Sequence, residues 1–169
     1  MTKTEKRELE VQRQKAALKN TLFNRYLLFR YSLALFFFTN LYWLIIQFIQ
    51  PSLYMIMPAI LLVFTILASA EQFRLYGNND EPNLKWTKRV FIFQLLSQFV
   101  CLSLIAIAQQ FTVIFPIFAN KQAAQLFVAG MLLLGAALCL LNLKRLDKIT
   151  HHADRAYKRY QAMLGQQLH

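Results

Sequence analysis

Ionisable residues are missing from the middle of every long apolar stretch of this chain. The four stretches run through about residues 27–49, 53–70, 90–108 and 123–143, and their central parts hold no Asp, Glu, Lys, Arg or His. An ionisable group deep in a membrane span is the usual mark of ion transport or proton relay. The absence of such groups argues against a proton-coupled transporter.

Glycine and cysteine are also scarce, with four Gly and two Cys. The chain has no phosphate-cradling glycine loop, no H-E-x-x-H motif and no supported Ser/His/Asp grouping. Cys101 and Cys139 lie inside apolar stretches and form no C-x-x-C pair, as is typical of structural cysteines. In the sequence His151-His152-x-Asp154, His151 and Asp154 are one helical turn apart and could share a metal ion, but no third ligand is nearby, so a solvated face explains them. We therefore predict a non-enzymatic protein without a metal or a cofactor.

Hydrophobic residues are abundant, at 57% of the 169 residues. Each apolar stretch is close to the roughly 20 residues that cross a ~30 Å hydrocarbon layer. Open strands cannot cross lipid because their backbone groups would lack partners. The sequence therefore predicts an all-α integral membrane four-helix bundle over residues 27–143. We expect a basic amphipathic helix over residues 1–26 and another over residues 144–169 that continues the fourth span.

Positive charge is unevenly distributed along the chain, which carries a net charge of +11. Of the 19 Lys and Arg, Lys121 is the exception to a clear pattern. The others, and all 8 Asp and Glu, lie before the first span, between the second and third spans, after the fourth span, or at the ends of these spans that adjoin those segments. Short connections rich in Lys and Arg stay in the cytoplasm, which predicts a multi-pass protein with both termini cytoplasmic. From the compactness of the chain and the absence of another targeting signal, we expect a bacterial plasma membrane. Next to spans, these residues are expected to meet anionic lipid head groups rather than nucleic acid.

Two charges lie at the edges of the first predicted hairpin. The uncharged sequence Gln50-Pro51-Ser52 predicts a tight turn, because proline disfavours a helix before it and suits the start of the next one. Arg30 and Glu71 each lie about 20 residues from this turn and so at equal depth. We predict a structural ion pair between them, with an Arg30 that extends toward lipid phosphates as the alternative.

A stripe of polar residues follows one face of the third span. Gln94, Ser97, Gln98 and Cys101 have the spacing i, i+3, i+4 and i+7, and Asn142 lies at a comparable depth in the fourth span. Such residues most often form hydrogen bonds between helices. They can also line a pore or a ligand cavity, and both interpretations stay open.

The third apolar stretch continues to Phe118, which makes it too long for an upright span. A tilted helix would accommodate the extra length. Alternatively, residues 111–118, interrupted at Pro116, lie along the outer face of the membrane. The second arrangement is favoured because Gln109 and Gln110 would then sit at the membrane rim.

Small residues in the fourth span predict close approach of another helix, because their spacing of seven places them on common faces. This helix packing strip consists of Ala129, Gly130, Ala136 and Ala137.

Beyond the fourth span, apolar residues recur at alternating spacings of three and four, as in a coiled coil. With no Gly or Pro between Asn142 and Leu164, the pattern predicts one long helix whose apolar seam needs a partner. The seam consists of Leu146, Ile149, Ala153, Ala156, Tyr160 and Met163.

These features favour an accessory, scaffolding or regulatory subunit of a membrane complex. Its partner would be a larger membrane protein or further copies of the chain in a homo-oligomer. One alternative is a small oligomeric transporter, channel or hole-forming protein, in which several copies bring Gln94 and Gln98 around a path. A second alternative is a sensor of anionic lipid surfaces that uses the basic helices at both ends.

Overall fold

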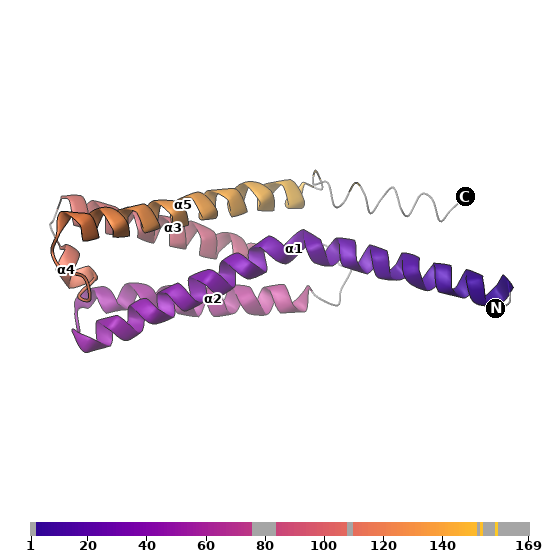
Figure 1. The fold of residues 1–169 in the computed structure, drawn as a ribbon, viewed down its shortest axis with the longest axis horizontal. Coiled ribbons are helices and arrows are strands. Elements are labelled where there is room, and N and C mark those ends of the chain that lie inside the picture. The colour runs from indigo at the N-terminus through magenta and orange to yellow at the C-terminus, as the bar shows by residue number, and fades with distance from the viewer. Residues whose placement is uncertain (1–2, 76–83, 108–109, 152, 154–157, 159–169) are drawn as a thin grey trace.

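A computed structural model describes residues 3–75, 84–107, 110–151, 153 and 158 of the chain (Figure 1). Every regular element in these residues is a helix. The elements are α1 (Lys3–Ile49), the 3₁₀ helix η1 (Leu53–Met55), α2 (Ile56–Arg74), α3 (Lys85–Ala106), α4 (Phe111–Ile114) and α5 (Gln122–Thr150).

Four segments in these helices are long and apolar enough to cross a membrane, which confirms the predicted number of spans. They are Tyr26–Ile49, Leu53–Arg74, Lys85–Ala106 and Gln122–Thr150. The chain is thus an all-α bundle with the features of a multi-pass membrane protein.

The first helix has no break where the basic N-terminal segment meets the first span. α1 runs continuously from Lys3 to Ile49 and extends beyond the ends of α2 and α3 (Figure 1). The predicted boundary at residue 26 is therefore a change in hydropathy along one helix, without a turn between two helices. The predicted turn after the first span is present, because α1 ends at Ile49 and Ser52 has extended backbone angles.

The spans form two helix pairs that meet at one end and diverge at the other. α1 packs along α2, α3 packs along α5, and α2 packs along α3, whereas α1 and α5 contact each other far less. Figure 1 shows the two pairs close together where α1 leaves the bundle, and further apart at the opposite end, where α4 lies between them. At the α4 end, α1 and α5 therefore belong to separate helix pairs.

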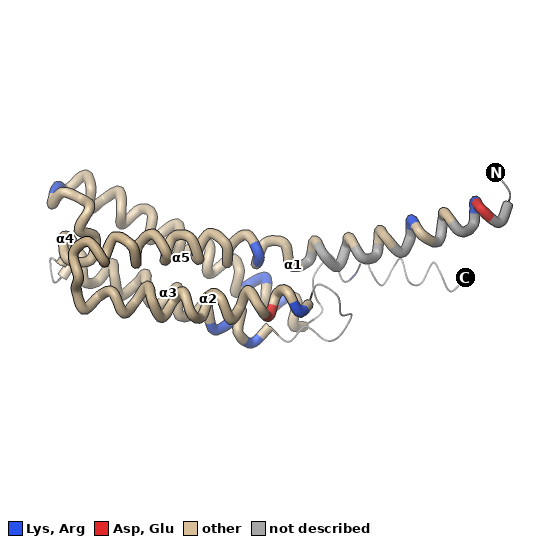
Figure 2. The backbone as a smooth tube through the Cα atoms, turned by 90° about the horizontal axis from the view of Figure 1, so that it is seen from below, with Lys and Arg blue, Asp and Glu red and all other residues tan. Residues whose placement is uncertain are grey.

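The Lys and Arg residues of the bundle gather at the end where the helix pairs meet (Figure 2). We call this the basic end, and the opposite end, where Lys121 precedes α5, the Lys121 end. The exposed residues of the basic end are Arg74, Lys85, Lys88, Arg89, Lys144, Arg145 and Lys148.

The hydrophobic core lies in the half of the bundle next to the basic end, which we call the packed half. The ring of Phe91 is fully buried, with its centroid 6.1 Å from that of Phe29 and 6.2 Å from that of Phe36. Tilted and edge-on aromatic pairs of this kind add to the dispersion energy that holds helices together in lipid. The buried core comprises Tyr26, Phe29, Leu33, Phe36, Ala68, Leu84, Val90, Phe91, Cys139, Leu146 and Ile149.

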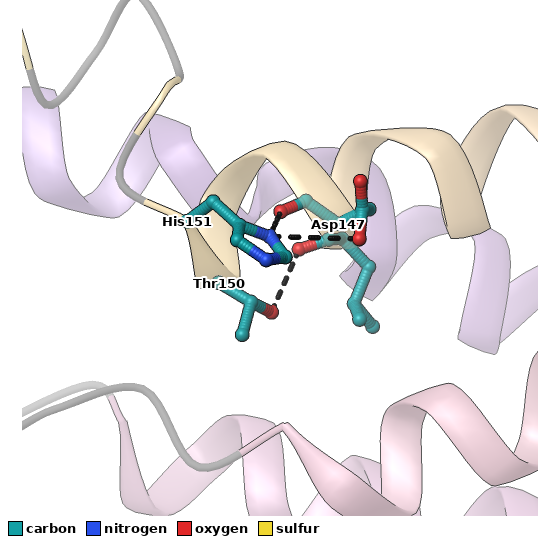
Figure 3. Close-up of polar contacts among 4 residues, drawn as sticks. Asp147, Thr150 and His151 are labelled. Carbon is teal, nitrogen blue, oxygen red and sulfur yellow. Dashed lines mark hydrogen bonds and ion pairs between the residues drawn. The ribbon is translucent and has the colours of Figure 1, made fainter.

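The helix of the fourth span continues beyond residue 143 but ends earlier than the sequence predicts. α5 stops at Thr150, so the expected continuous helix to Leu164 is interrupted there. Ile149 is the last core residue, and a helix that has lost its packing partners must rely on intrinsic propensity, which is weak for Ile, Thr and His. At this end the Thr150 hydroxyl donates to the Leu146 carbonyl at 2.9 Å, and the Nδ1 of His151 lies 2.9 Å from the Asp147 carbonyl oxygen (Figure 3).

Candidate functional site

Residues 110–118 form a separate segment that closes the Lys121 end. α3 ends at Ala106 and α4 is a distinct helix, so the prediction that this segment does not extend the third span is confirmed. Its position at the outer face of the membrane stays a prediction, and Phe111 and Ile114 are fully buried at this end of the bundle. The segment turns inward because α1 offers donors to its free carbonyl groups.

Two side chains of α1 hold this segment in place. The indole Nε1 of Trp43 donates to the Ile114 carbonyl at 3.0 Å, and the Nε2 of Gln47 donates to the same oxygen at 2.7 Å. The Trp43 ring also stacks on Phe115 at 5.7 Å. The Ser52 hydroxyl donates to Gln47 Oε1 at 2.7 Å, so the Gln47 amide also binds the turn between the first two spans.

Behind this segment lies a cavity of about 690 Å³ between α1, α3 and α5. Its wall contains no Asp, Glu, Lys, Arg or His, and most of it is hydrocarbon and aromatic rings. The lining residues are Leu35, Phe36, Thr39, Asn40, Tyr42, Trp43, Ile46, Gln94, Ser97, Gln98, Cys101, Phe115, Ile117, Phe118, Val128, Met131, Leu132, Leu134, Gly135 and Leu138.

The polar stripe of the third span lies on the α3 wall of this cavity. The stripe therefore lines a cavity and also takes part in hydrogen bonding between helices. Gln94 forms a buried bond between helices, since its Oε1 accepts from Asn40 Nδ2 at 2.9 Å. The Ser97 hydroxyl donates to the carbonyl of its own helix at Gln94, 2.9 Å away. Gln98 and Cys101 complete the row of lining residues.

The amide of Gln98 is packed against α5 at a glycine. Gln98 is 5% exposed, and its Oε1 has no hydrogen-bond partner in the described part of the chain. A Cβ added at Gly135 would overlap the Gln98 amide nitrogen. Gly135 therefore makes the room in which this amide lies. Nothing in the spacing of the predicted packing strip pointed to Gly135, because its partner comes from another helix.

Asn142 lies outside the cavity and joins α5 to α1 in the packed half. Its Nδ2 donates to Ser32 Oγ at 2.8 Å and to the Leu138 carbonyl at 2.8 Å. Asn142 is fully buried, and its Oδ1 has no partner among the described residues. Asn142 therefore resembles the residues of the stripe in its polar side chain but does not lie beside them on the cavity wall. Its partner Ser32 was not identified from the sequence.

Glu71 caps the start of α3. Its Oε1 accepts from the Trp86 backbone N–H at 3.1 Å, and its Oε2 accepts from the N–H and the hydroxyl of Thr87, both at 2.8 Å. The first N–H groups of a helix have no partner inside the helix and carry partial positive charge, so a carboxylate stabilises them. The predicted pairing of Glu71 with Arg30 stays a prediction.

The predicted packing strip faces two directions. Ala136 is 5% exposed and Ala129 is half-buried, so this pair belongs to the side of α5 that meets the bundle. Ala137 is exposed, and a Cβ added at Gly130 would meet no atom within 4 Å. The Gly130 and Ala137 pair therefore lies on the outward face of α5.

The predicted partner seam beyond the fourth span divides at the end of α5. Leu146 and Ile149 are buried in the core of this same bundle, so α1 and α3 already cover them. Ala153 is exposed. The remaining positions, Ala156, Tyr160 and Met163, lie outside the described residues.

The polar groups of the cavity lining are amides, hydroxyls, the Trp43 indole and the Cys101 thiol. The amides and hydroxyls can donate and accept hydrogen bonds. In the described residues, no three His, Cys, Asp or Glu side chains come close enough to hold a metal ion. Comparisons with known protein families, with curated proteins and with solved structures found no match to this chain.

Proposed function

We propose that this chain is a non-enzymatic accessory or scaffolding subunit that binds another transmembrane helix along the outward face of α5. The partner is a larger membrane protein or a second copy of the chain. The observation that carries the proposal is the outward position of Gly130 and Ala137.

The outward face of α5 has the composition of a helix-packing surface. Gly130 and Ala137 are seven residues apart, and exposed leucines come before, between and after them at heptad spacing. These are Leu126, Leu133 and Leu140, which are 65%, 56% and 46% exposed. Association in lipid depends on close packing, for which small residues between leucines let two backbones approach.

The buried polar groups support a structural role for the bundle. Within the described spans, Asn40 bonds to Gln94, Asn142 bonds to Ser32, and further amides hold the Lys121 end. These bonds join neutral groups and stabilise the monomer. They provide no buried charge of the kind that ion transport uses. The channel alternative has less support, because Gln94 and Gln98 are 4% and 5% exposed within one copy and so cannot face a central axis without a rearrangement.

Affinity purification in a mild detergent, followed by mass spectrometry and mass determination, tests this proposal. We expect a stoichiometric partner with the unaltered chain and loss of that partner with Gly130→Leu or Ala137→Leu. Ala70→Leu is the matched control, because Ala70 is exposed on α2 and its enlargement leaves α5 unchanged. A chain that is monomeric and without a stoichiometric partner in lipid nanodiscs would refute the accessory role. Equal loss with Ala70→Leu would refute the α5 surface.

A further inference from the structure

We infer that the cavity between α1 and α5 is a binding site for an uncharged, long-chain lipophilic molecule that carries a hydroxyl or carbonyl group. This site is separate from the outward face of α5 and does not depend on the accessory role. The inference combines the access, the size and the polar contents of the cavity.

The cavity opens sideways, between α1 and α5. Five of its lining residues are more than half exposed, and four of them lie on these two helices, namely Leu35 and Tyr42 on α1 and Met131 and Leu134 on α5. The fifth, Ile117, belongs to the segment that closes the Lys121 end. The helices α1 and α5 contact each other far less than the other neighbouring helices do. A molecule dissolved in the membrane can therefore enter between them without first crossing water.

The volume favours a small molecule over a protein segment. At about 690 Å³ the cavity lies in the range of roughly 300–1,000 Å³ that is usual for ligand pockets. On α1 the lining runs from Leu35 to Ile46, about three turns of a span that has about five. A partner helix can therefore cover the mouth of the cavity but cannot lie inside it along a full span.

The polar contents indicate which group the ligand carries. The Gln98 amide lies in the cavity wall with an Oε1 that is buried and has no partner in the described part of the chain. Leaving a buried amide oxygen without a hydrogen bond is costly, and rotation of the amide lets it donate to or accept from a bound molecule. Thr39 and Ser97 do not compete for this role, because their hydroxyls donate to the carbonyls of Leu35 and Gln94.

The absence of charge from the lining indicates that the ligand is neutral. No Lys, Arg or His lines the cavity to pair with a phosphate or a carboxylate, and no Asp or Glu lines it to pair with an amine. A bare charge in such surroundings would lose its hydration without compensation. A long-chain alcohol, amide or ester satisfies these conditions, whereas a free fatty acid or a phospholipid head group does not.

Trp43 provides a direct test, because it lines the cavity and the chain has one other tryptophan. In a Trp86→Phe background, the purified full chain is reconstituted in phosphatidylcholine nanodiscs and titrated with a dibrominated long-chain alcohol, a quencher of indole fluorescence. We expect saturable quenching at low mole fraction, reversed by the unbrominated alcohol. A dibrominated fatty acid at pH 9 and a dibrominated phosphatidylcholine should give weak quenching that rises linearly.

Two variants separate a built site from an ordinary lipid-facing surface. Ser97→Leu fills the cavity and should weaken the apparent affinity at least tenfold, whereas Ser103→Leu, on the exposed side of the same helix, should leave it unchanged. Gln98→Leu should weaken binding of the alcohol about fivefold, the usual effect of one neutral hydrogen bond, without changing that of a dibrominated alkane.

Three results would overturn the inference. These are linear quenching by the alcohol, equal quenching by phosphatidylcholine and alcohol, and no difference between the Ser97→Leu and Ser103→Leu variants. A thermal unfolding curve of each variant guards against misfolding. If Ser97→Leu does not fold, the Gln98→Leu comparison between alcohol and alkane decides the question.

Discussion

The two halves of this bundle are built from the same four helices but differ in how the helices meet. In the packed half, Phe91 fills the centre and Asn142 bonds α5 to α1. In the half toward the Lys121 end, α1 and α5 separate around a cavity, and a short segment held by Trp43 and Gln47 closes the end. The comparison teaches that an apolar bundle can be tightly packed at one end and keep a ligand-sized space at the other.

The largest expected effect follows from removing a ring from the packed half. Phe91→Ala should lower the free energy of unfolding by about 3–5 kcal/mol, because it opens a new cavity in a closed core. Phe115→Ala, at the wall of the existing cavity, should cost about 1 kcal/mol, the order of one aromatic pair. Denaturant unfolding in mixed micelles measures both values. Equal losses would show that the two halves are packed alike.

A smaller effect is expected at the junction between α2 and α3. Glu71→Ala removes the acceptor of three hydrogen bonds at the start of α3 and should cost about 2 kcal/mol. Glu71→Gln keeps an acceptor without the charge and should recover about half of that loss. The same unfolding assay measures both variants. If Gln were as damaging as Ala, the interaction with the helix N-terminus would not be the reason for the effect.

Double-mutant cycles compare the hydrogen bonds in the two halves. The Ser32→Ala and Asn142→Leu cycle probes the packed half, and the Asn40→Leu and Gln94→Leu cycle probes the cavity wall. Each coupling energy should be about 0.6 kcal/mol, with an upper bound of about 1.7 kcal/mol, as for other membrane helices. A coupling near zero for Asn40 and Gln94 would mean that this bond does not hold the cavity wall together.

The smallest effect distinguishes the two glycines of α5. Gly130→Ala should raise the free energy of unfolding by about 0.5 kcal/mol, because the new Cβ meets open space and alanine favours the helix. Gly135→Ala should bring no such gain, since its Cβ must displace the Gln98 amide. Thermal unfolding of the monomer in detergent compares the two. A gain at Gly135 equal to that at Gly130 would show that the amide moves freely into the cavity.

Part of the candidate site could be predicted from the sequence, because helical periodicity shows which residues share one face of a helix. The spacing of Gln94, Ser97 and Gln98 placed them on one face of a helix, and they do share one cavity wall. Their partners could not be deduced in this way. Asn40 is 54 residues from Gln94, and Gly135 becomes a site residue through contact with Gln98. A helical repeat shows which residues share a face of one helix, but it does not show which residues of another helix contact that face.

One further prediction failed for a related reason. The sequence between Asn142 and Leu164 contains no helix breaker, yet α5 ends at Thr150, where the core ends with it. Trp43 and Gln47 hold residues 111–118 through the Ile114 carbonyl, a contact that no pattern within that segment predicts. In both places the outcome depended on whether another helix was within reach, which the local sequence does not reveal.

The amino-acid sequence by itself determined the four spans and the gathering of basic residues at one end. These properties follow from the length and hydropathy of each segment, and hydrophobic thickness and charge act on each segment separately. Tertiary structure alone decided that α1 and α5 diverge, that Glu71 caps α3 and that a neutral cavity remains beside Gln98. Such features depend on which side chains of distant segments come together, and no single segment carries that information.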